Sequence, residues 1–231
     1  FSNSNHNYAP FWADEKKIYY SSNRINPSEF ELYMYDFEEQ KEEKILLDGE
    51  IMLGLSVSGI SNKADKLFCN GQQKGKLTDD LYYIDLTDKK KYQLTKNDLQ
   101  EWGAVLSKDE KWLAYTSEKD MEGSFAIYIN KFPEMNQEIR ISSGGGEEPK
   151  WMPDGSGVYY RNGSQWMKVK LVLNSEPEIG EPELFFEGDY VNVWGPSHDI
   201  FPNGKILLLK GDKWIPPTEI DVIVNVLNSE F

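Results

Sequence analysis

Few residues in this sequence are of the types that carry out catalysis. The 231 residues include two histidines, His6 and His198, and one cysteine, Cys69. The sequence has no His-x-x-x-His or paired Cys/His spacing, and it has no G-x-S-x-G motif. A zinc site would therefore lack ligands, and a serine hydrolase triad would have to recruit one of two distant histidines. We expect no catalytic residue, no metal and no cofactor in this chain.

Adjacent carboxylates are the second candidate for chemistry, because paired acids can act as general acid and base. Neighbours along a strand point to opposite faces, so such a pair can share a substrate only where the backbone bends. We therefore interpret three adjacent pairs as solvated acids of loops: Glu42-Glu43, Asp79-Asp80 and Glu147-Glu148.

Two glycine-containing segments could bind ions, but neither has the required spacing. GGGEEP (144–149) has three glycines but no Lys-Ser/Thr pair, so it does not match a phosphate-binding loop. We interpret it as a flexible loop that leads from one strand into the next repeat. GQQKGKLTDD (71–80) lacks the acid spacing of a calcium-binding loop.

The overall composition limits the partners that this chain could have. Asp plus Glu number 39 against 25 Lys plus Arg, which gives a formal charge of −14. An acidic surface repels phosphate backbones, so we expect no nucleic acid partner. No apolar run approaches the roughly 18 residues of a membrane helix, so we expect no membrane insertion. The chain starts at Phe1 without a recognisable signal peptide, which indicates a removed leader or the C-terminal part of a longer protein.

The elements that must position these side chains form a repeat. Five turn positions lie 49, 46, 45 and 49 residues apart: Asp14, Lys63, Asp109, Asp154 and Asn203. Each turn joins two runs rich in β-branched and aromatic residues, as in KWMPDGSGVYYRN (150–162). An alternating strand follows in every unit, for example ELYMYDF (31–37), and four of the five units add a last short strand. Four antiparallel strands repeated at this period are typical of β-propeller blades.

We therefore predict an all-β protein that is one β-propeller domain over residues 1–231. Five blades are visible, at about 8–49, 54–97, 102–144, 147–188 and 192–227. The fifth unit ends without a fourth strand. Either residues 1–7 supply that strand, or the ring contains a further blade. The native ring then has five or six blades.

The same segments resemble the repeat of the TolB-like, WD40-like (PD40) propellers of bacteria. The match lies in APFWADEKKIYYSSNR (9–24) followed by ELYMYDF, and in SSGGGEEPKWMPDGSGVYYRNG (142–163). The tail from 203 to 227 is similar to the final blade of C-terminal propellers in bacterial multidomain proteins. The resemblance implies a bacterial, periplasmic or otherwise extracytoplasmic binding scaffold. The chain departs from the pattern at Lys63, where the second unit has no turn acid, and it lacks the glycine after Asp14 and Asp109.

The propeller prediction also locates a binding site. The first strand of every blade lines the central channel, so residues at one register converge on the axis. We expect ligand contacts at the channel mouth, from seven candidates: Asn7, Ser56, Glu101, Trp102, Glu147, Glu148 and His198. Trp102 either touches the ligand or packs between blades. His198 either fills space or projects a titratable group into the channel.

Two functions of different class remain open. The first, which the missing catalytic motifs favour, is a non-catalytic and monomeric scaffold that binds a protein, peptide or glycan. The second is a propeller enzyme, a lyase or a hydrolase, or the propeller accessory domain of a larger enzyme or sensor kinase. A cluster of His198, Arg161 and Lys150 around a cavity would favour the enzyme. Burial of those side chains against neighbouring blades would argue against it.

Overall fold

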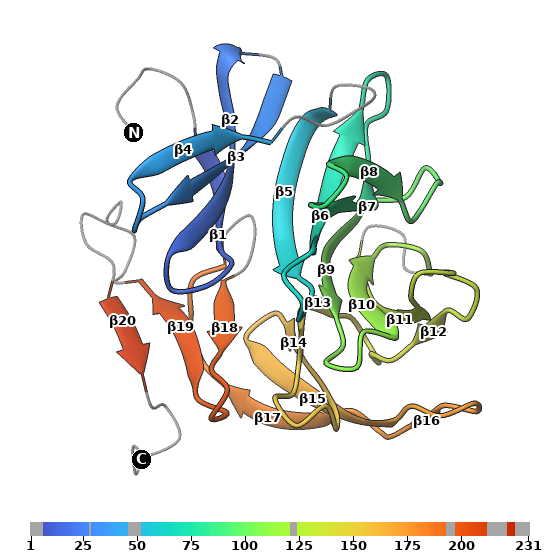
Figure 1. The fold of residues 1–231 in the computed structure, drawn as a ribbon. Coiled ribbons are helices and arrows are strands. Elements are labelled where there is room, and N and C mark those ends of the chain that lie inside the picture. The colour runs from blue at the N-terminus through green and yellow to red at the C-terminus, as the bar shows by residue number, and fades with distance from the viewer. Residues whose placement is uncertain are drawn as a thin grey trace.

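Five antiparallel sheets surround a common centre in the computed structural model of this chain (Figure 1). The structure describes residues 7–27, 29–45, 52–120, 124–192, 197–211 and 221–224, and these residues contain strands but no helix. In every sheet the strand that comes first in the sequence lies nearest to the centre (Figure 1). The prediction of an all-β propeller is confirmed.

The first three sheets, blades 1 to 3, have four strands each, in chain order. Blade 1 contains β1 (Asn7–Trp12), β2 (Lys17–Asn26), β3 (Glu29–Asp36) and β4 (Lys41–Lys44). Blade 2 contains β5 (Met52–Ile60), β6 (Lys66–Gln73), β7 (Asp79–Asp85) and β8 (Lys90–Gln93). Blade 3 contains β9 (Glu101–Leu106), β10 (Trp112–Ser117), β11 (Ala126–Lys131) and β12 (Ile139–Arg140).

Blades 4 and 5 depart from this pattern at their outer strands. Blade 4 contains β13 (Glu147–Trp151), β14 (Gly157–Asn162) and β15 (Gln165–Val172). Its outer position is shared by β16 (Glu178–Ile179) and β17 (Glu183–Glu187), which pair with different parts of β15. Blade 5 contains β18 (His198–Ile200), β19 (Ile206–Lys210) and β20 (Asp221–Val224). Most of the segment 1–7, expected to complete blade 5, lies outside the described residues, and Asn7 itself pairs with Ser22 in blade 1.

Short polar side chains build the turns between the first and second strands. Asp14 Oδ1 accepts hydrogen bonds from the main-chain nitrogens of Lys16 (2.7 Å) and Lys17 (2.8 Å). Asp154 Oδ1 accepts the nitrogen of Ser156 at 3.0 Å in the same way. A carboxylate that binds these nitrogens stabilises the reversal of the chain.

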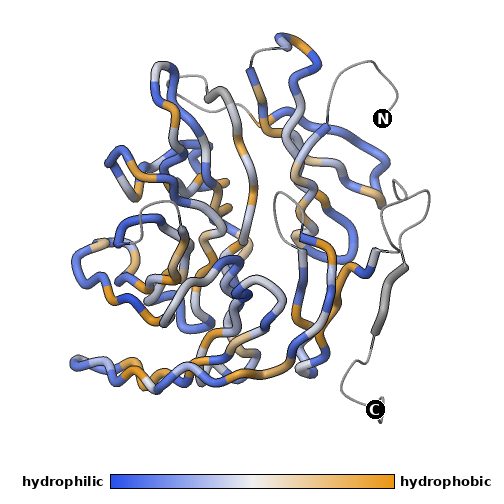
Figure 2. The backbone as a smooth tube through the Cα atoms, turned by 180° about the vertical axis from the view of Figure 1, so that it is seen from behind, coloured by the Kyte–Doolittle hydropathy of each residue, from blue (hydrophilic) through white to orange (hydrophobic). Residues whose placement is uncertain are grey.

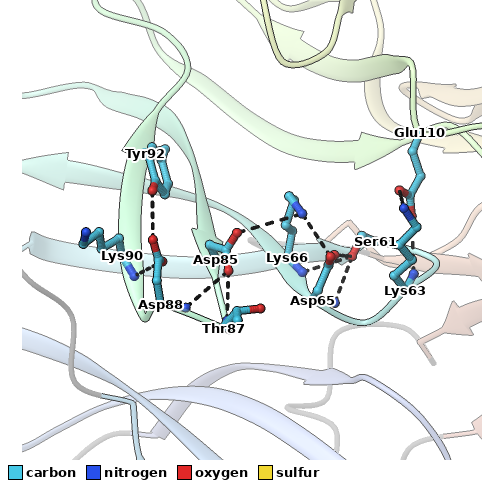
Figure 3. Close-up of polar contacts among 10 residues, drawn as sticks. All are labelled: Ser61, Lys63, Asp65, Lys66, Asp85, Thr87, Asp88, Lys90, Tyr92 and Glu110. Carbon is cyan, nitrogen blue, oxygen red and sulfur yellow. Dashed lines mark hydrogen bonds and ion pairs between the residues drawn. The ribbon is translucent and has the colours of Figure 1, made fainter.

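Blade 2 achieves the same turn with a different pair of side chains. Ser61 Oγ lies 2.7 Å from Asp65 Oδ1 and accepts the nitrogen of Lys66 at 3.0 Å (Figure 3). The turn position of this unit therefore has no acid, and the Ser61 hydroxyl binds the main-chain nitrogens instead, while Asp65 accepts the Ser61 hydroxyl. Lys63, which stands at the usual acid position, instead pairs with Glu110 in the turn of blade 3 at 3.8 Å (Figure 3).

A bulge recurs in the first strand of blades 1 to 4. The pairing register shifts after Tyr8, Val57, Trp102 and Glu147. A bulge inserts residues that have no partner and bends the strand. The turn after it is one residue shorter in blade 1 than in blade 4, so Trp12 lies opposite Ile18 as Trp151 lies opposite Val158.

Apolar clusters fill the spaces between successive blades. Tyr19 and Leu67 belong to the cluster between blades 1 and 2, and Phe68 and Leu113 to that between blades 2 and 3. Two further clusters lie between blades 3 and 4, around Trp112 and Val158, and between blades 4 and 5, around Trp166 and Leu208. Figure 2 shows apolar residues along the strands and mostly hydrophilic residues in the turns. The strands of blades 2 to 4 are thus held by burial on both sheet faces.

Candidate functional site

The predicted site residues lie at one end of the sheets. Asn7, Glu101, Glu147 and His198 are the first residues of their strands. This end is opposite the turns described above, and the loops from second to third strands share it. The exposure of the seven candidates differs: Asn7 is exposed, Ser56, Trp102 and Glu147 are half-buried, and Glu101, Glu148 and His198 are buried.

The structure brings two of the candidates into direct contact. His198 Nδ1 lies 3.1 Å from Glu148 Oε2, and the two side chains are 0% and 1% exposed. The same oxygen accepts the main-chain nitrogen of Ser197 at 2.6 Å and the hydroxyl of Ser197 at 2.8 Å. Glu148 lies in the bulge of β13 with a φ of 56°, an uncommon conformation for a residue with a side chain. The bulge thus orients the carboxylate of blade 4 toward blade 5.

Arg161, which was not among the predicted site residues, completes this network. Its Nη1 donates to Ser197 Oγ and to the carbonyl of Val191, both at 2.9 Å. Nη2 donates to the carbonyl of Tyr190 at 3.0 Å, and Nε donates to that of Gly163 at 2.7 Å. A buried guanidinium needs several acceptors, so an arginine inside an apolar strand such as VYYRN is a sequence signal for this role.

The electrostatics keep Glu148 ionised. Burial by itself raises the pKa of Glu148, but the hydrogen bonds and charge of His198, together with the bonds from Ser197, lower it overall. The pKa of the neighbouring Glu147 is raised, first by burial and then by repulsion from Glu148. Both oxygens of Glu148 accept hydrogen bonds within the protein. The cluster therefore fastens Tyr190, Val191, Ser197 and His198 to blade 4. We name Glu148, Arg161, Ser197 and His198 the interblade latch.

Glu101 and Trp102 do not converge with the interblade latch. They are neighbours in β9 and point to opposite faces of blade 3. Glu101 accepts the hydroxyl of Ser117 at 3.4 Å, its Oε2 is buried without a hydrogen-bond partner, and burial raises its pKa. Trp102 lies edge-on to Phe125, with ring centroids 6.0 Å apart. Among the described residues, no hydrogen bond joins this pair to Glu148.

Two adjacent acid pairs differ from the expectation of solvated loop acids. Asp80 is fully buried and binds Lys76 Nζ at 3.0 Å, while Asp79 accepts Asn70 Nδ2 at 2.7 Å. Glu148 is buried as well. The interpretation is wrong for Asp80 and Glu148, because loops and bulges fold the second acid of each pair inward, where fixed donors replace water.

The glycine-rich segment before Glu147 also differs from its predicted flexibility. Gly145 and Gly146 are buried, and the nitrogen of Gly146 donates to the carbonyl of Phe125 at 2.9 Å. A Cβ atom at Gly146 would lie 2.9 Å from side-chain atoms of both Ile127 and Tyr160. Glycine is needed here because blades 3 and 4 approach each other closely.

Solved structures share this arrangement of blades around a centre. TolB from Acinetobacter baumannii matches with a TM-score of 0.67 and 20% sequence identity, over 92% of this chain and 50% of that chain. A putative TolB from Agrobacterium tumefaciens matches with a TM-score of 0.69 and 22% identity, over 97% of this chain and 77% of that chain. The fold is a TolB-like β-propeller.

The similarity of this TolB-like propeller to other proteins is structural. An oligogalacturonate lyase in complex with manganese has a TM-score of 0.62 at 10% identity, over 91% of this chain and 75% of that chain. Identities this low indicate a shared fold and leave activity open. No family model matches the chain, and no curated protein matches its sequence. The chain spans half the length of the Acinetobacter baumannii TolB.

In the part of the chain that the structure describes, no three His, Cys, Asp or Glu side chains are grouped so that they could hold a metal ion. In the same residues, no helix has the length and apolarity to cross a membrane. Cys69 is buried, and burial raises the pKa of its thiol to about 12.

Proposed function

We propose that this TolB-like propeller is a non-catalytic scaffold that binds a protein, peptide or glycan at the loop end of its blades. The observation that carries the proposal is the exposure of two aliphatic side chains at that end. Leu77, in the loop between β6 and β7, is 94% exposed, and Ile25, at the end of β2, is 67% exposed. They belong to neighbouring blades and share the end of the sheets with the seven predicted site residues.

The loop that carries Leu77 is held in place on both sides. Lys76 Nζ binds Asp80 at 3.0 Å and the carbonyl of Asn97 at 2.7 Å. Gln72 Nε2 donates to the carbonyl of Lys76 at 2.8 Å. A side chain that is presented to solvent by a fixed loop loses little conformational entropy on binding. This supports Leu77 as an anchor for an apolar partner surface.

A cluster of His198, Arg161 and Lys150 around a cavity would have favoured an enzyme, and the contacts of these three side chains support a scaffold instead. Arg161 and His198 are buried in the interblade latch. Lys150 Nζ pairs with Asp199 at 3.3 Å, and its side chain is mostly covered. Arg161 binds Ser197, His198 binds Glu148 and Lys150 binds Asp199, so each side chain makes a polar contact between blades 4 and 5, as expected for structural residues.

A propeller enzyme is the second candidate, and the similarity to an oligogalacturonate lyase is the observation that favours it. The formal charge of −14 opposes it for an anionic polysaccharide, because like charges repel. An assay for unsaturated products from oligogalacturonate, with and without manganese, tests this candidate. Product formation above that of a heat-denatured sample would contradict the scaffold proposal.

Arrays of peptides and glycans test the scaffold proposal directly. The wild type is compared with the double variant Ile25→Ser/Leu77→Ser and with Leu184→Ser, a control residue that is 51% exposed on β17. We expect ligands whose affinity falls about tenfold or more in the double variant and stays unchanged in the control. Equal binding by all three proteins would contradict a site at the loop end.

The setting of the scaffold is part of the same proposal. The TolB-like fold supports a periplasmic or otherwise extracytoplasmic location, and we propose that the chain is a monomer. Cell fractionation of the product of the complete gene tests the location. Light scattering after size-exclusion chromatography tests the monomer, and a mass above 26.7 kDa that depends on concentration would contradict it.

A further inference from the structure

The outer strands of the blades differ in how their free edges are protected. The outermost strand of a sheet has main-chain N–H and C=O groups without a neighbouring strand, and proteins protect such edges with lysines or by keeping the strand short. β4 of blade 1 has the sequence KEEK, and β8 of blade 2 has KKYQ. β12 of blade 3 and β16 of blade 4 have only two residues each. Each of these four edges therefore has a protective feature.

β17 of blade 4 has neither feature. It contains five residues, Glu183–Glu187, with the sequence ELFFE and no lysine. Within the described residues it pairs with β15 alone, and residues 183–187 make no main-chain hydrogen bond to another element. Because successive residues of an antiparallel strand direct their main-chain groups to alternate sides, about half of these groups point away from β15. We name this side of residues 183–187 the open edge of β17, and it lies at the periphery of the ring (Figure 1).

Aromatic packing holds the open edge of β17 in place. Phe186 stacks on Trp166 with ring centroids 4.9 Å apart, and Phe185 lies against Tyr159 at the same centroid distance. Both phenylalanines pack against the apolar cluster between blades 4 and 5. An edge that is already fixed loses little conformational entropy when a further strand pairs with it.

Acidic side chains determine which kind of strand fits this edge. Glu183 and Glu187 lie at the two ends of β17, and both are exposed. Glu183 Oε2 lies 3.4 Å from Lys168 Nζ with its side chain 58% exposed, and Glu187 Oε1 accepts the hydroxyl of Ser164 at 3.1 Å. Exposed contacts of this kind are weak, so both carboxylates can bind a cation from another chain. The formal charge of −14 also attracts a basic partner.

A second copy of this chain fits the open edge of β17 poorly. In a two-fold antiparallel pairing centred on Phe185, Glu183 of each chain would lie opposite Glu187 of the other. Like charges directly opposite each other destabilise a sheet. Two molecules with a formal charge of −14 also repel each other. The charges therefore favour a basic segment of a different protein.

We propose that the open edge of β17 binds an extended basic segment of a partner protein as an additional strand of blade 4. The main-chain groups of the segment pair with those of β17, and its lysine or arginine side chains bind Glu183 and Glu187. Ile25 and Leu77, which carry the proposed function, lie on blades 1 and 2. The open edge of β17 is thus a second binding surface, and it does not depend on the first.

Fluorescence anisotropy with a labelled basic peptide, KTVTVTK, tests this surface. We expect saturable binding that weakens as salt is raised. The same peptide with N-methylated internal amides should bind about tenfold or more weakly, because it keeps the charges but lacks main-chain donors. In the complex with the unmodified peptide, amide exchange of residues 183–187 should slow.

Variants of the protein separate the edge from the rest of the acidic surface. Glu183→Lys/Glu187→Lys gives β17 the lysines that protect β4 and β8, and it should bind the peptide about tenfold or more weakly. The control Glu15→Lys/Glu134→Lys makes the same change of charge at exposed positions of blades 1 and 3 and should bind like the wild type. Leu184→Ser keeps the main chain and both carboxylates, so it should also bind like the wild type, as should Ile25→Ser/Leu77→Ser.

Several results would overturn the proposal. They are absence of saturable binding, equal affinity for the peptide and its N-methylated form, and unchanged affinity in Glu183→Lys/Glu187→Lys. Loss of binding in Ile25→Ser/Leu77→Ser would assign the peptide to the loop end instead. A wild-type dimer in which residues 183–187 exchange slowly would assign the edge to a second copy. If Glu183→Lys/Glu187→Lys fails to fold, the N-methylated peptide decides with the wild type alone.

Discussion

At the scale of single residues, two buried glutamates have opposite electrostatic roles. Glu148 is surrounded by donors and its pKa is lowered, whereas Glu101 keeps one oxygen without a partner and its pKa is raised by burial. A carboxyl with a lowered pKa stabilises the fold when ionised, and one with a raised pKa destabilises it. Substitution of each glutamate by glutamine should therefore change stability in opposite directions.

Glu148→Gln is expected to lower the free energy of unfolding by about 3 kcal/mol at pH 7, because it leaves His198 and Arg161 in a network without its anion. The folded pKa lies below the unfolded value, so this contribution is present above the unfolded value and is lost as pH falls through the folded pKa. Urea denaturation from pH 7 to pH 3 should show wild type and variant converging. Glu181→Gln, at an exposed position, is the control, and parallel curves for wild type and Glu148→Gln would contradict the argument.

Glu101→Gln is expected to raise the free energy of unfolding by about 1 kcal/mol at pH 7, because a buried, partly unsatisfied charge is replaced by a neutral amide. The folded pKa lies above the unfolded value, so the penalty exists at high pH and disappears below the unfolded value, near 4.5. Denaturation at pH 7 and pH 4 should show the gain only at the higher pH. If Glu101→Gln were less stable than the wild type at pH 7, the Glu101 carboxylate would have to make stronger hydrogen bonds than the structure shows, and the argument would be contradicted.

At the scale of elements, the crossover from blade 3 to blade 4 depends on glycine. Gly146→Ala places a methyl group 2.9 Å from Ile127 and Tyr160, and it is expected to cost about 2 kcal/mol of stability. Gly54→Ala in β5 meets no atom within 4 Å and should change stability by less than about 0.5 kcal/mol. Thermal denaturation of both variants checks this, and equal melting temperatures would show that the crossover can move.

The turns illustrate how one element tolerates different residues. Blade 2 has Lys63 where blades 1, 3 and 4 have aspartate, yet the Ser61 hydroxyl accepts the main-chain nitrogens of Asp65 and Lys66 in that turn. Lys63 then becomes free to pair with Glu110 of the next blade. Such exposed pairs contribute little stability, so the turn itself is maintained by the hydrogen bonds of Ser61.

At the scale of the whole molecule, the interblade latch connects the last blade to the rest. Arg161→Met removes the donors to Tyr190, Val191 and Ser197 and is expected to raise amide exchange in β18 and β19 more than tenfold. Exchange in β6 and β10 should remain slow, because their clusters do not include Arg161. Uniform acceleration in all blades would contradict a local role and indicate that the propeller unfolds as one unit.

Much of this architecture could be predicted because its signals are local. Turn acids, strand alternation and a period of 45 to 49 residues depend on neighbours in the chain, and they predict blades, turns and an all-β fold. Polar residues at the beginnings of the first strands also predicted at which end of the sheets the candidate site lies.

Only the tertiary structure decided which of these side chains meet. The contact between Glu148 and His198 joins residues 50 positions apart, and it depends on a bulge that no local pattern marks. The shorter turn of blade 1 likewise places Trp12 opposite Ile18, the position that Trp151 takes opposite Val158 in blade 4. Burial of Asp80 likewise depends on Lys76 and Asn97 folding over it. Local sequence determines where a strand begins and turns, whereas the packing of one blade against the next determines which acids are buried and which aromatics stay exposed.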